Sequence, residues 1–212
     1  SGLPPLSADR AALYQPIARE VEVQAAILEL SLNDAFEERD AGTAEIAWRL
    51  VRLAVSEWDR LAEILSVLSF TLSKHLGEAR AVVPTRSMAA HHFKSPVMVD
   101  FMRMHELLDQ LVFRSKLRFQ LRLRVLRRAV ENLSAEFRRA YRYAERTGDQ
   151  PPELWTRFDH YFHDLDLVAK ETLLAFRAFL TCLPHTALPK FAADLQAVMR
   201  NKVRSVSVLA DR

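Results

Sequence analysis

Apolar residues recur along this chain at alternating spacings of four and three residues, which places them on one face of an α-helix. One uninterrupted series comprises Ala47, Val51, Ala54, Trp58, Leu61, Leu65, Leu68 and Leu72. A second series, which includes one threonine, comprises Leu154, Phe158, Tyr161, Leu165, Val168, Thr172, Phe176, Phe179 and Leu183. A looser series near the start comprises Leu13, Ile17, Val21, Leu28, Leu32 and Ala35. The pattern predicts long amphipathic helices whose apolar faces form a core.

Glycine and proline mark the expected helix ends. Gly42 stands directly before Thr43, the order expected where one helix ends at a C′ glycine and the next begins at an N-cap threonine. Gly77 follows two cations and is expected to end the second helix. Ser95 and Pro96 form an N-cap and a first-turn proline, which open the third helix.

Gly148 is expected to close the third helix, and prolines at 151, 152 and 184 flank the fourth. The expected helices span about 8–41, 44–76, 97–147, 152–183 and 189–208. The third contains no Gly or Pro and would extend roughly 75 Å at 1.5 Å per residue. Pro16 is a position at which the first helix can be interrupted. Residues 77–95 are expected to form a long connection, with a short helix over 85–93 as an option.

We therefore predict an all-α fold, an antiparallel bundle of about five helices with one very long central helix. A single domain is expected over residues 1–212. The 4 glycines argue against a turn-rich β architecture. The single cysteine, Cys182, excludes an internal disulfide, favours a reducing compartment and suggests a cytoplasmic location. It is expected to be a small buried apolar residue.

No transmembrane segment is predicted, because the uncharged runs are shorter than the roughly 20 apolar residues that a spanning helix needs. The sequence begins Ser-Gly without Met and shows no signal peptide. One hypothesis is therefore that the chain is an excised cytosolic domain of a larger, membrane-associated protein.

The stretch KLRFQLRLRV at 116–125 alternates apolar and polar residues, a pattern typical of a half-buried strand. No second strand candidate exists to pair with it, so we place it on the third helix. There its apolar residues divide between two opposite faces. One face comprises Phe119, Leu123 and Leu126 and continues into the core through Val130, Leu133, Phe137, Ala140 and Ala144. The other comprises Leu117, Leu121 and Val125, and it should be covered by the first or last helix, a second copy of the chain, or a partner.

The same stretch is strongly basic, since residues 114–128 carry seven Lys and Arg and no acid. The first helix is acidic, with a balance of −5 over residues 7–41. In one interpretation the arginines pair with that helix. In the other they face outward and bind an anionic partner, which would be nucleic acid, an anionic lipid surface or an acidic protein. No helix-turn-helix, zinc-finger or RNP-like pattern is present.

These features predict a non-enzymatic scaffold or adaptor, which binds a protein partner or a second copy as a homodimer through helix 97–147. Nucleic acid or anionic lipid is the less favoured partner. The predicted partner-binding residues are Arg114, Leu117, Arg118, Leu121, Arg122, Arg124, Val125 and Arg128.

The segment DHYFHDLD holds the densest group of potential metal ligands. Asp159, His163 and Asp166 share one helix face and could hold a metal if another helix added ligands. No Glu-x-x-His motif of the kind found in di-metal bundles occurs in the chain, so no metal site is predicted. The expectation is a solvated flank with the i,i+4 pairs His160–Asp164 and Asp159–His163. A small-ligand or metal-binding bundle around His163 remains the alternative function.

Several catalytic signatures are missing from the sequence. It has no glycine-rich phosphate loop, no G-x-S-x-G elbow, no H-E-x-x-H and no C-x-x-C. No catalytic residue and no cofactor is therefore predicted. The adjacent His91 and His92 are interpreted as exposed loop residues, and Trp48, Trp58 and Trp155 as core residues.

Overall fold

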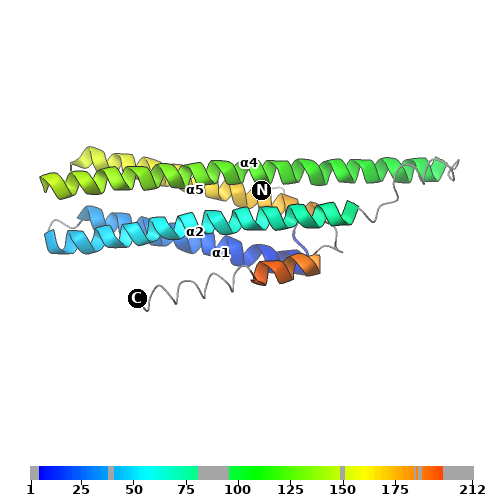
Figure 1. Ribbon diagram of the computed structural model, residues 1–212, viewed down its shortest axis with the longest axis horizontal. Helices are drawn as coiled ribbons and strands as arrows, with labels where there is room; N and C mark the ends of the chain where they lie inside the picture. The colour runs from blue at the N-terminus through cyan, green and yellow to red at the C-terminus, as the bar shows by residue number, and fades with distance from the viewer. Residues whose placement is uncertain are drawn as a thin grey trace. The chain divides into compact units, whose positions relative to one another are not determined.

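The computed structural model describes residues 5–37, 41–80, 96–148, 151–183, 185 and 188–197. In these ranges the regular structure is helical throughout, and they contain no β-strand (Figure 1). The all-α prediction is confirmed, and the alternating stretch 116–125 lies on a helix. None of the helices in the described ranges has both the length and the apolarity that crossing a bilayer requires.

The labelled helices are α1 (Ala8–Glu37), α2 (Ala41–Arg80), α4 (Pro96–Thr147) and α5 (Pro152–Cys182). A further helix occupies residues 188–197. The bounds of α4 and α5 agree with the predicted ones to within one residue, because proline and glycine mark their ends. Helix α4 is 52 residues long. Residues 81–95, which include His91 and His92, and the predicted last part of the final helix lie outside the described residues.

Two predictions from glycine were wrong, and the interruption considered at Pro16 does not occur. Helix α2 already begins at Ala41, so Gly42 and Thr43 lie within its first turn instead of forming a cap. It also continues past Gly77 to Arg80, and α1 continues through Pro16 without interruption. An isolated glycine costs a helix about 1 kcal/mol relative to alanine, less than burial of the apolar stripe provides.

Gly148 closes α4 as predicted. Its φ of 64° lies in the left-handed region, and its N–H donates to the carbonyl oxygen of Ala144 at 2.9 Å. This is the geometry of a C′ residue, and glycine adopts it without the steric cost that a Cβ would bring.

The chain divides into two compact units, each built from parts of the same helices. Unit 1 comprises Ser1–Leu13, Ser66–Gln120 and Ala175–Arg212, and unit 2 comprises Tyr14–Leu65 and Leu121–Leu174.

The core of unit 1 contains a group of phenylalanines. Phe119 of α4 stacks on Phe176 and Phe179 of α5, with ring centroids 5.2 and 6.3 Å apart. All three are buried, together with Phe191 of the helix over 188–197. Cys182 is only half-buried, and its Sγ lies 3.6 Å from the hydroxyl of Ser115.

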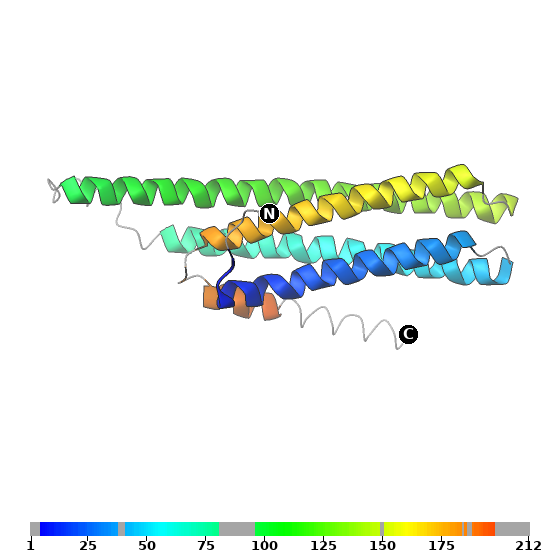
Figure 2. The same ribbon diagram turned by 180° about the vertical axis from the view of Figure 1, so that it is seen from behind.

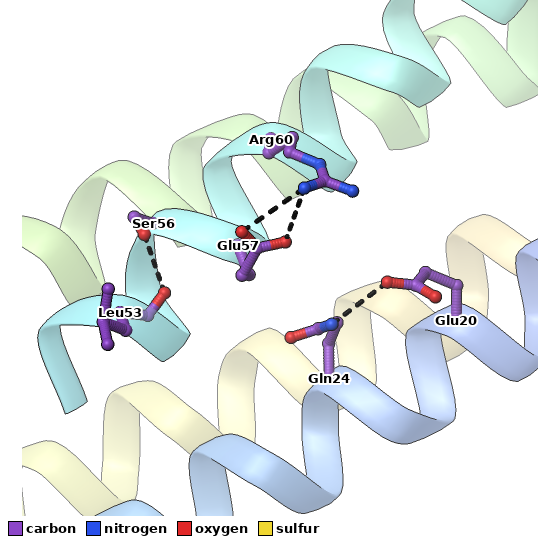
Figure 3. A network of polar contacts seen from close by, with 6 residues as sticks. All are labelled: Glu20, Gln24, Leu53, Ser56, Glu57 and Arg60. Carbon is purple, nitrogen blue, oxygen red and sulfur yellow. Dashed lines mark hydrogen bonds and ion pairs between the residues drawn. The ribbon is translucent and has the colours of Figure 1, made fainter. Parts of the chain in front are cut away.

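In unit 2, α1 lies beside α2 (Figures 1 and 2). Trp58 of α2 is completely buried, and its Nε1–H donates to the carbonyl oxygen of Gln24 at 3.3 Å. The Gln24 amide in turn donates to the carboxylate of Glu20 at 3.0 Å, while Arg60 pairs with Glu57 on α2 (Figure 3). The Trp58 indole thus links the two helices through a hydrogen bond.

Helices α2, α4 and α5 of unit 2 meet in an aromatic cluster around Trp48. Its ring stacks on Trp155 at 5.2 Å and lies 5.7 Å from Phe137, 6.1 Å from Tyr141 and 6.2 Å from Phe158. All three tryptophans of the chain are at least nine-tenths buried, which confirms their assignment to the core.

Helices α4 and α5 of unit 2 are also joined by ion pairs. Arg122 pairs with Glu171, and the buried Glu136 lies 3.8 Å from a guanidinium nitrogen of Arg157. Residue numbers therefore rise along α4 as they fall along α5 in this unit. On α4, the predicted core face is confirmed for Phe119, Leu123, Leu126, Val130, Leu133, Phe137 and Ala140, which are all buried, whereas its last member, Ala144, is only half-buried.

Candidate functional site

The second apolar face of α4 is open to solvent. Leu117, Leu121 and Val125 are 45%, 51% and 44% exposed. The expectation that the first or last helix covers them is wrong for the part of the chain that the structure describes. The reason is geometric, because Phe119 and Leu126 are buried in the core and the three residues lie on the opposite side of α4, which the described helices leave about half exposed.

Leu117 belongs to unit 1, whereas Leu121 and Val125 belong to unit 2, where α5 presents a matching face. Leu167 and Leu174 of α5 are 57% and 47% exposed and lie seven residues apart, on one side of the helix. Val125 and Leu167 line the same groove. We call the exposed set Leu121, Val125, Leu167 and Leu174 the α4/α5 surface.

The groove in this surface has a volume of about 220 Å³. Its walls are Val125, Ala129 and Asn132 on α4 and Tyr161, Asp164 and Leu167 on α5. It is smaller than the roughly 300–1,000 Å³ of a typical small-molecule site, but it can take one or two side chains of a partner.

The predicted arginines fall into two groups. Arg122 is half-buried, and its Nη1 lies 2.5 Å from the carboxylate of Glu171 on α5. Arg114, Arg118, Arg124 and Arg128 are exposed, and no described carboxylate lies within ion-pair distance of them. The interpretation in which this window pairs with the acidic first helix is therefore wrong for these four. Arg124 and Arg128 lie in unit 2, on the same stretch of α4 as the α4/α5 surface, and Arg114 and Arg118 belong to unit 1.

Two parts of the exposed apolar area were missed in the sequence. Leu167 and Leu174 flank the core series of α5, and their spacing of seven residues was the signal for a second face. In unit 1, α4 exposes a further set at spacings i, i+3, i+4 and i+7, which comprises Met104, Leu107, Leu108 and Leu111. These four are 52–60% exposed, so the first half of α4 also carries an uncovered apolar stripe.

The possible metal ligands lie on the solvated side of α5. Asp159 and His163 are exposed, and Asp166 pairs with Lys170 at 2.5 Å. The expected pair of His160 with Asp164 is present at 3.7 Å. Nowhere in the described ranges do three or more His, Cys, Asp or Glu side chains form a group that could hold a metal ion.

The chain was also compared with known proteins. The comparisons with protein family models, with curated proteins and with solved structures give no significant match.

Proposed function

We propose that this protein is a non-enzymatic scaffold or adaptor, which binds an acidic amphipathic helix of a partner protein on the α4/α5 surface. The observation that carries the proposal is the exposure of four aliphatic side chains on adjacent faces of α4 and α5, namely Leu121, Val125, Leu167 and Leu174. Full burial of one such side chain contributes about 1.5–3 kcal/mol. Since each is already about half-buried, covering all four would contribute on the order of 3–6 kcal/mol.

Charge favours an acidic partner. Arg124 and Arg128 are exposed beside the apolar residues and have no carboxylate partner among the described residues. Carboxylates on the incoming helix would pair with them, which raises the association rate and fixes the orientation. Two copies of this chain that met through the same surface would bring guanidinium groups of like charge together. A homodimer through this surface is therefore less favourable than an acidic partner.

We further propose that the helices form an antiparallel bundle of about five helices within a single domain, with α4 as its long central helix. The opposed numbering of the Arg122–Glu171 and Glu136–Arg157 contacts supports this arrangement. In such a bundle α4 supplies a rigid support, on which the exposed side chains are held in fixed relative positions.

A designed peptide tests the function. The probe is a synthetic amphipathic helix with leucines at i, i+4 and i+7 and glutamates beside them, and its binding is measured by isothermal titration calorimetry. We expect the Leu121→Ser/Leu167→Ser variant to bind about ten-fold more weakly or worse. The control is Leu30→Ser/Leu53→Ser, which removes two leucines of the same unit that are 63% and 62% exposed on α1 and α2. This control and the wild-type protein should bind equally.

Three outcomes would overturn the proposal. The first is equal binding of the peptide by both double variants. The second is a concentration-dependent dimer in sedimentation experiments that Leu121→Ser/Leu167→Ser abolishes, which would assign the surface to a second copy. The third is binding of heparin or a polynucleotide without binding of the peptide, which would assign the arginines to nucleic acid or another polyanion. A scrambled peptide of the same composition separates pattern recognition from simple charge attraction.

A further inference from the structure

A second groove in unit 2 lies on the side of α4 that faces α2, and the proposed partner surface does not use it. It has a volume of about 730 Å³, within the range of sites for small organic ligands. Both helices contribute to its lining, which includes Trp48, Arg49 and Arg52 from α2 and Arg138, Tyr141 and Arg142 from α4.

Aromatic contacts fix how the two helices are aligned in this groove. The ring of Trp48 lies 5.7 Å from that of Phe137 and 6.1 Å from that of Tyr141. Arg138 and Arg142 directly follow these two aromatic residues in the sequence, and Arg49 directly follows Trp48. Guanidinium groups from both helices therefore gather beside the aromatic cluster.

Acidic residues lie toward the other end of the groove. Asp59 lies seven residues beyond Arg52 on α2, which is about 10 Å along the helix axis. Glu131 lies seven residues before Arg138 on α4. The groove thus has an excess of arginine at the end near Trp48, where Glu45 also lines it, and is acidic at the end near Asp59.

Two of the arginines at the basic end are already bound. Arg49 pairs with Glu45 at 2.6 Å, and Arg138 donates to the backbone carbonyl and the hydroxyl of Ser134, both at 3.3 Å. Arg52 and Arg142 line the groove without an ion pair or hydrogen bond to any residue that the structure describes. Their donors are available to a ligand.

The Trp48 indole gives a second indication of a ligand site, which does not depend on the arginines. It is 96% buried in the aromatic cluster, yet its indole N–H has no acceptor within the described parts of the chain. Trp58, the other tryptophan of α2, does donate its N–H to a backbone carbonyl. A buried donor without an acceptor is costly, and indole nitrogens in cores normally find one. Because this nitrogen is itself buried, an oxygen atom of a ligand in the groove reaches it only if the Trp48 ring turns toward the groove on binding.

We propose that the α2/α4 groove binds a small organic anion, a phosphate or a carboxylate attached to a planar ring. Arg52 and Arg142 hold the anionic group from the two sides of the groove, since guanidinium donors match phosphate and carboxylate geometry. The Trp48 N–H donates to one of the ligand's oxygens, and the planar ring packs against the exposed edge of the cluster at Tyr141.

The probes are 1-naphthyl phosphate and 1-naphthoate, with 1-naphthol and inorganic phosphate as ligands that lack the charge or the ring. Binding to the full chain is measured by isothermal titration calorimetry. We expect single-site binding of at least one naphthyl anion, and about ten-fold weaker binding, or none, for 1-naphthol and for inorganic phosphate. Preference for the phosphate assigns the natural ligand to organic phosphates, and equal or better binding of the carboxylate assigns it to organic acids.

Two variants test the named contacts. Arg52→Gln/Arg142→Gln should weaken the bound naphthyl anion about ten-fold or more. Trp48→Phe keeps an aromatic ring but removes the N–H, and it should weaken binding several-fold without abolishing it. The control Arg19→Gln/Arg127→Gln removes the same two charges from exposed positions of unit 2 outside the groove, and it should bind like the wild type.

The proposal is wrong if neither naphthyl anion binds, or if the control weakens binding as much as Arg52→Gln/Arg142→Gln. It is also wrong if 1-naphthol binds as tightly as the anions, since the arginines would then contribute nothing. Far-UV circular dichroism of each variant checks that the helices are intact. If Trp48→Phe loses helicity, the arginine variants alone decide the outcome.

Discussion

Arg122 of α4 and Glu171 of α5 form an ion pair with 2.5 Å between Nη1 and Oε2. The next residue, Thr172, is fully buried. Its hydroxyl donates to the carbonyl oxygen of Val168 on the same helix at 2.7 Å, and it also lies 3.4 Å from the carbonyl oxygen of Arg122 on α4. Helices α4 and α5 are thus joined here by a partly exposed ion pair and, one residue further along α5, by a hydrogen bond from a buried hydroxyl. Leu121 directly precedes Arg122, and Leu174 lies three residues after Glu171. The ion pair therefore lies next to the α4/α5 surface.

The ion pair should contribute little to the stability of the free protein. Its side chains are 35% and 38% exposed, so solvent screens the attraction. We expect a coupling energy of about 0.2–1 kcal/mol from a double-mutant cycle with Arg122→Ala and Glu171→Ala in urea denaturation. Added salt should reduce it further. A coupling well above this range would show that the pair is more strongly desolvated than its exposure indicates.

Substitutions of Gly148 measure the cost of its backbone conformation separately from side-chain contacts. No heavy atom lies within 4 Å of where a Cβ would stand, so an added methyl group meets nothing. Its φ of +64° remains unfavourable for alanine, and Gly148→Ala should lower the free energy of unfolding by about 1–2 kcal/mol. Gly148→Asn should cost less, because asparagine tolerates the left-handed region. Equal costs in chemical denaturation would contradict this explanation.

Pro16 offers a stabilising substitution. It lies inside α1 on the exposed side, where it removes one hydrogen bond of the helix. Alanine at an interior helix position is favoured over proline by about 3 kcal/mol, less about 0.4–1 kcal/mol for the added entropy of the unfolded chain. We therefore expect Pro16→Ala to raise the unfolding free energy by about 2–2.6 kcal/mol, read from thermal and urea unfolding. The neighbouring exposed Gln15→Ala should change it by less than about 0.5 kcal/mol.

Two phenylalanines of unit 1 should differ sharply in how much their replacement by alanine destabilises the protein. Phe176 is fully buried and stacks on Phe119, and Phe176→Ala should cost about 3–5 kcal/mol. Phe70 on α2 is 74% exposed, and Phe70→Ala should stay within about 0.5 kcal/mol. Similar losses for both in denaturant unfolding would mean that Phe70 is covered in solution, for instance by a second molecule.

The helices and their buried faces could be predicted from the sequence because the information is local. Spacings of four and three residues identify Trp58, Leu65 and Phe176 as core positions without knowledge of any neighbour. The helix ends were less predictable, since Gly42 and Gly77 resemble caps but both lie within α2. The choice between a cap and a helix interior depends on packing, which a short sequence window does not contain.

The candidate site depended on contacts between distant segments, and much of it could not be predicted. Exposure of Leu121 requires that no other helix lies over it, which the spacing of residues on α4 does not determine. The pairing of Arg122 with Glu171 and the shared groove of Arg52 and Arg142 join positions that are 49 and 90 residues apart in the sequence. Such relationships follow from which helices become neighbours.

The three tryptophans and four tyrosines of this chain all fall within the two segments of unit 2, Tyr14–Leu65 and Leu121–Leu174. Tryptophan and tyrosine fluorescence, and their near-ultraviolet circular dichroism, therefore report the unfolding of unit 2. Far-ultraviolet circular dichroism of the backbone reports the unfolding of both units. Superimposable melting curves from the two signals would mean that both halves unfold together. A backbone transition with no change in indole emission would reveal that unit 1 opens on its own, without any label having been introduced.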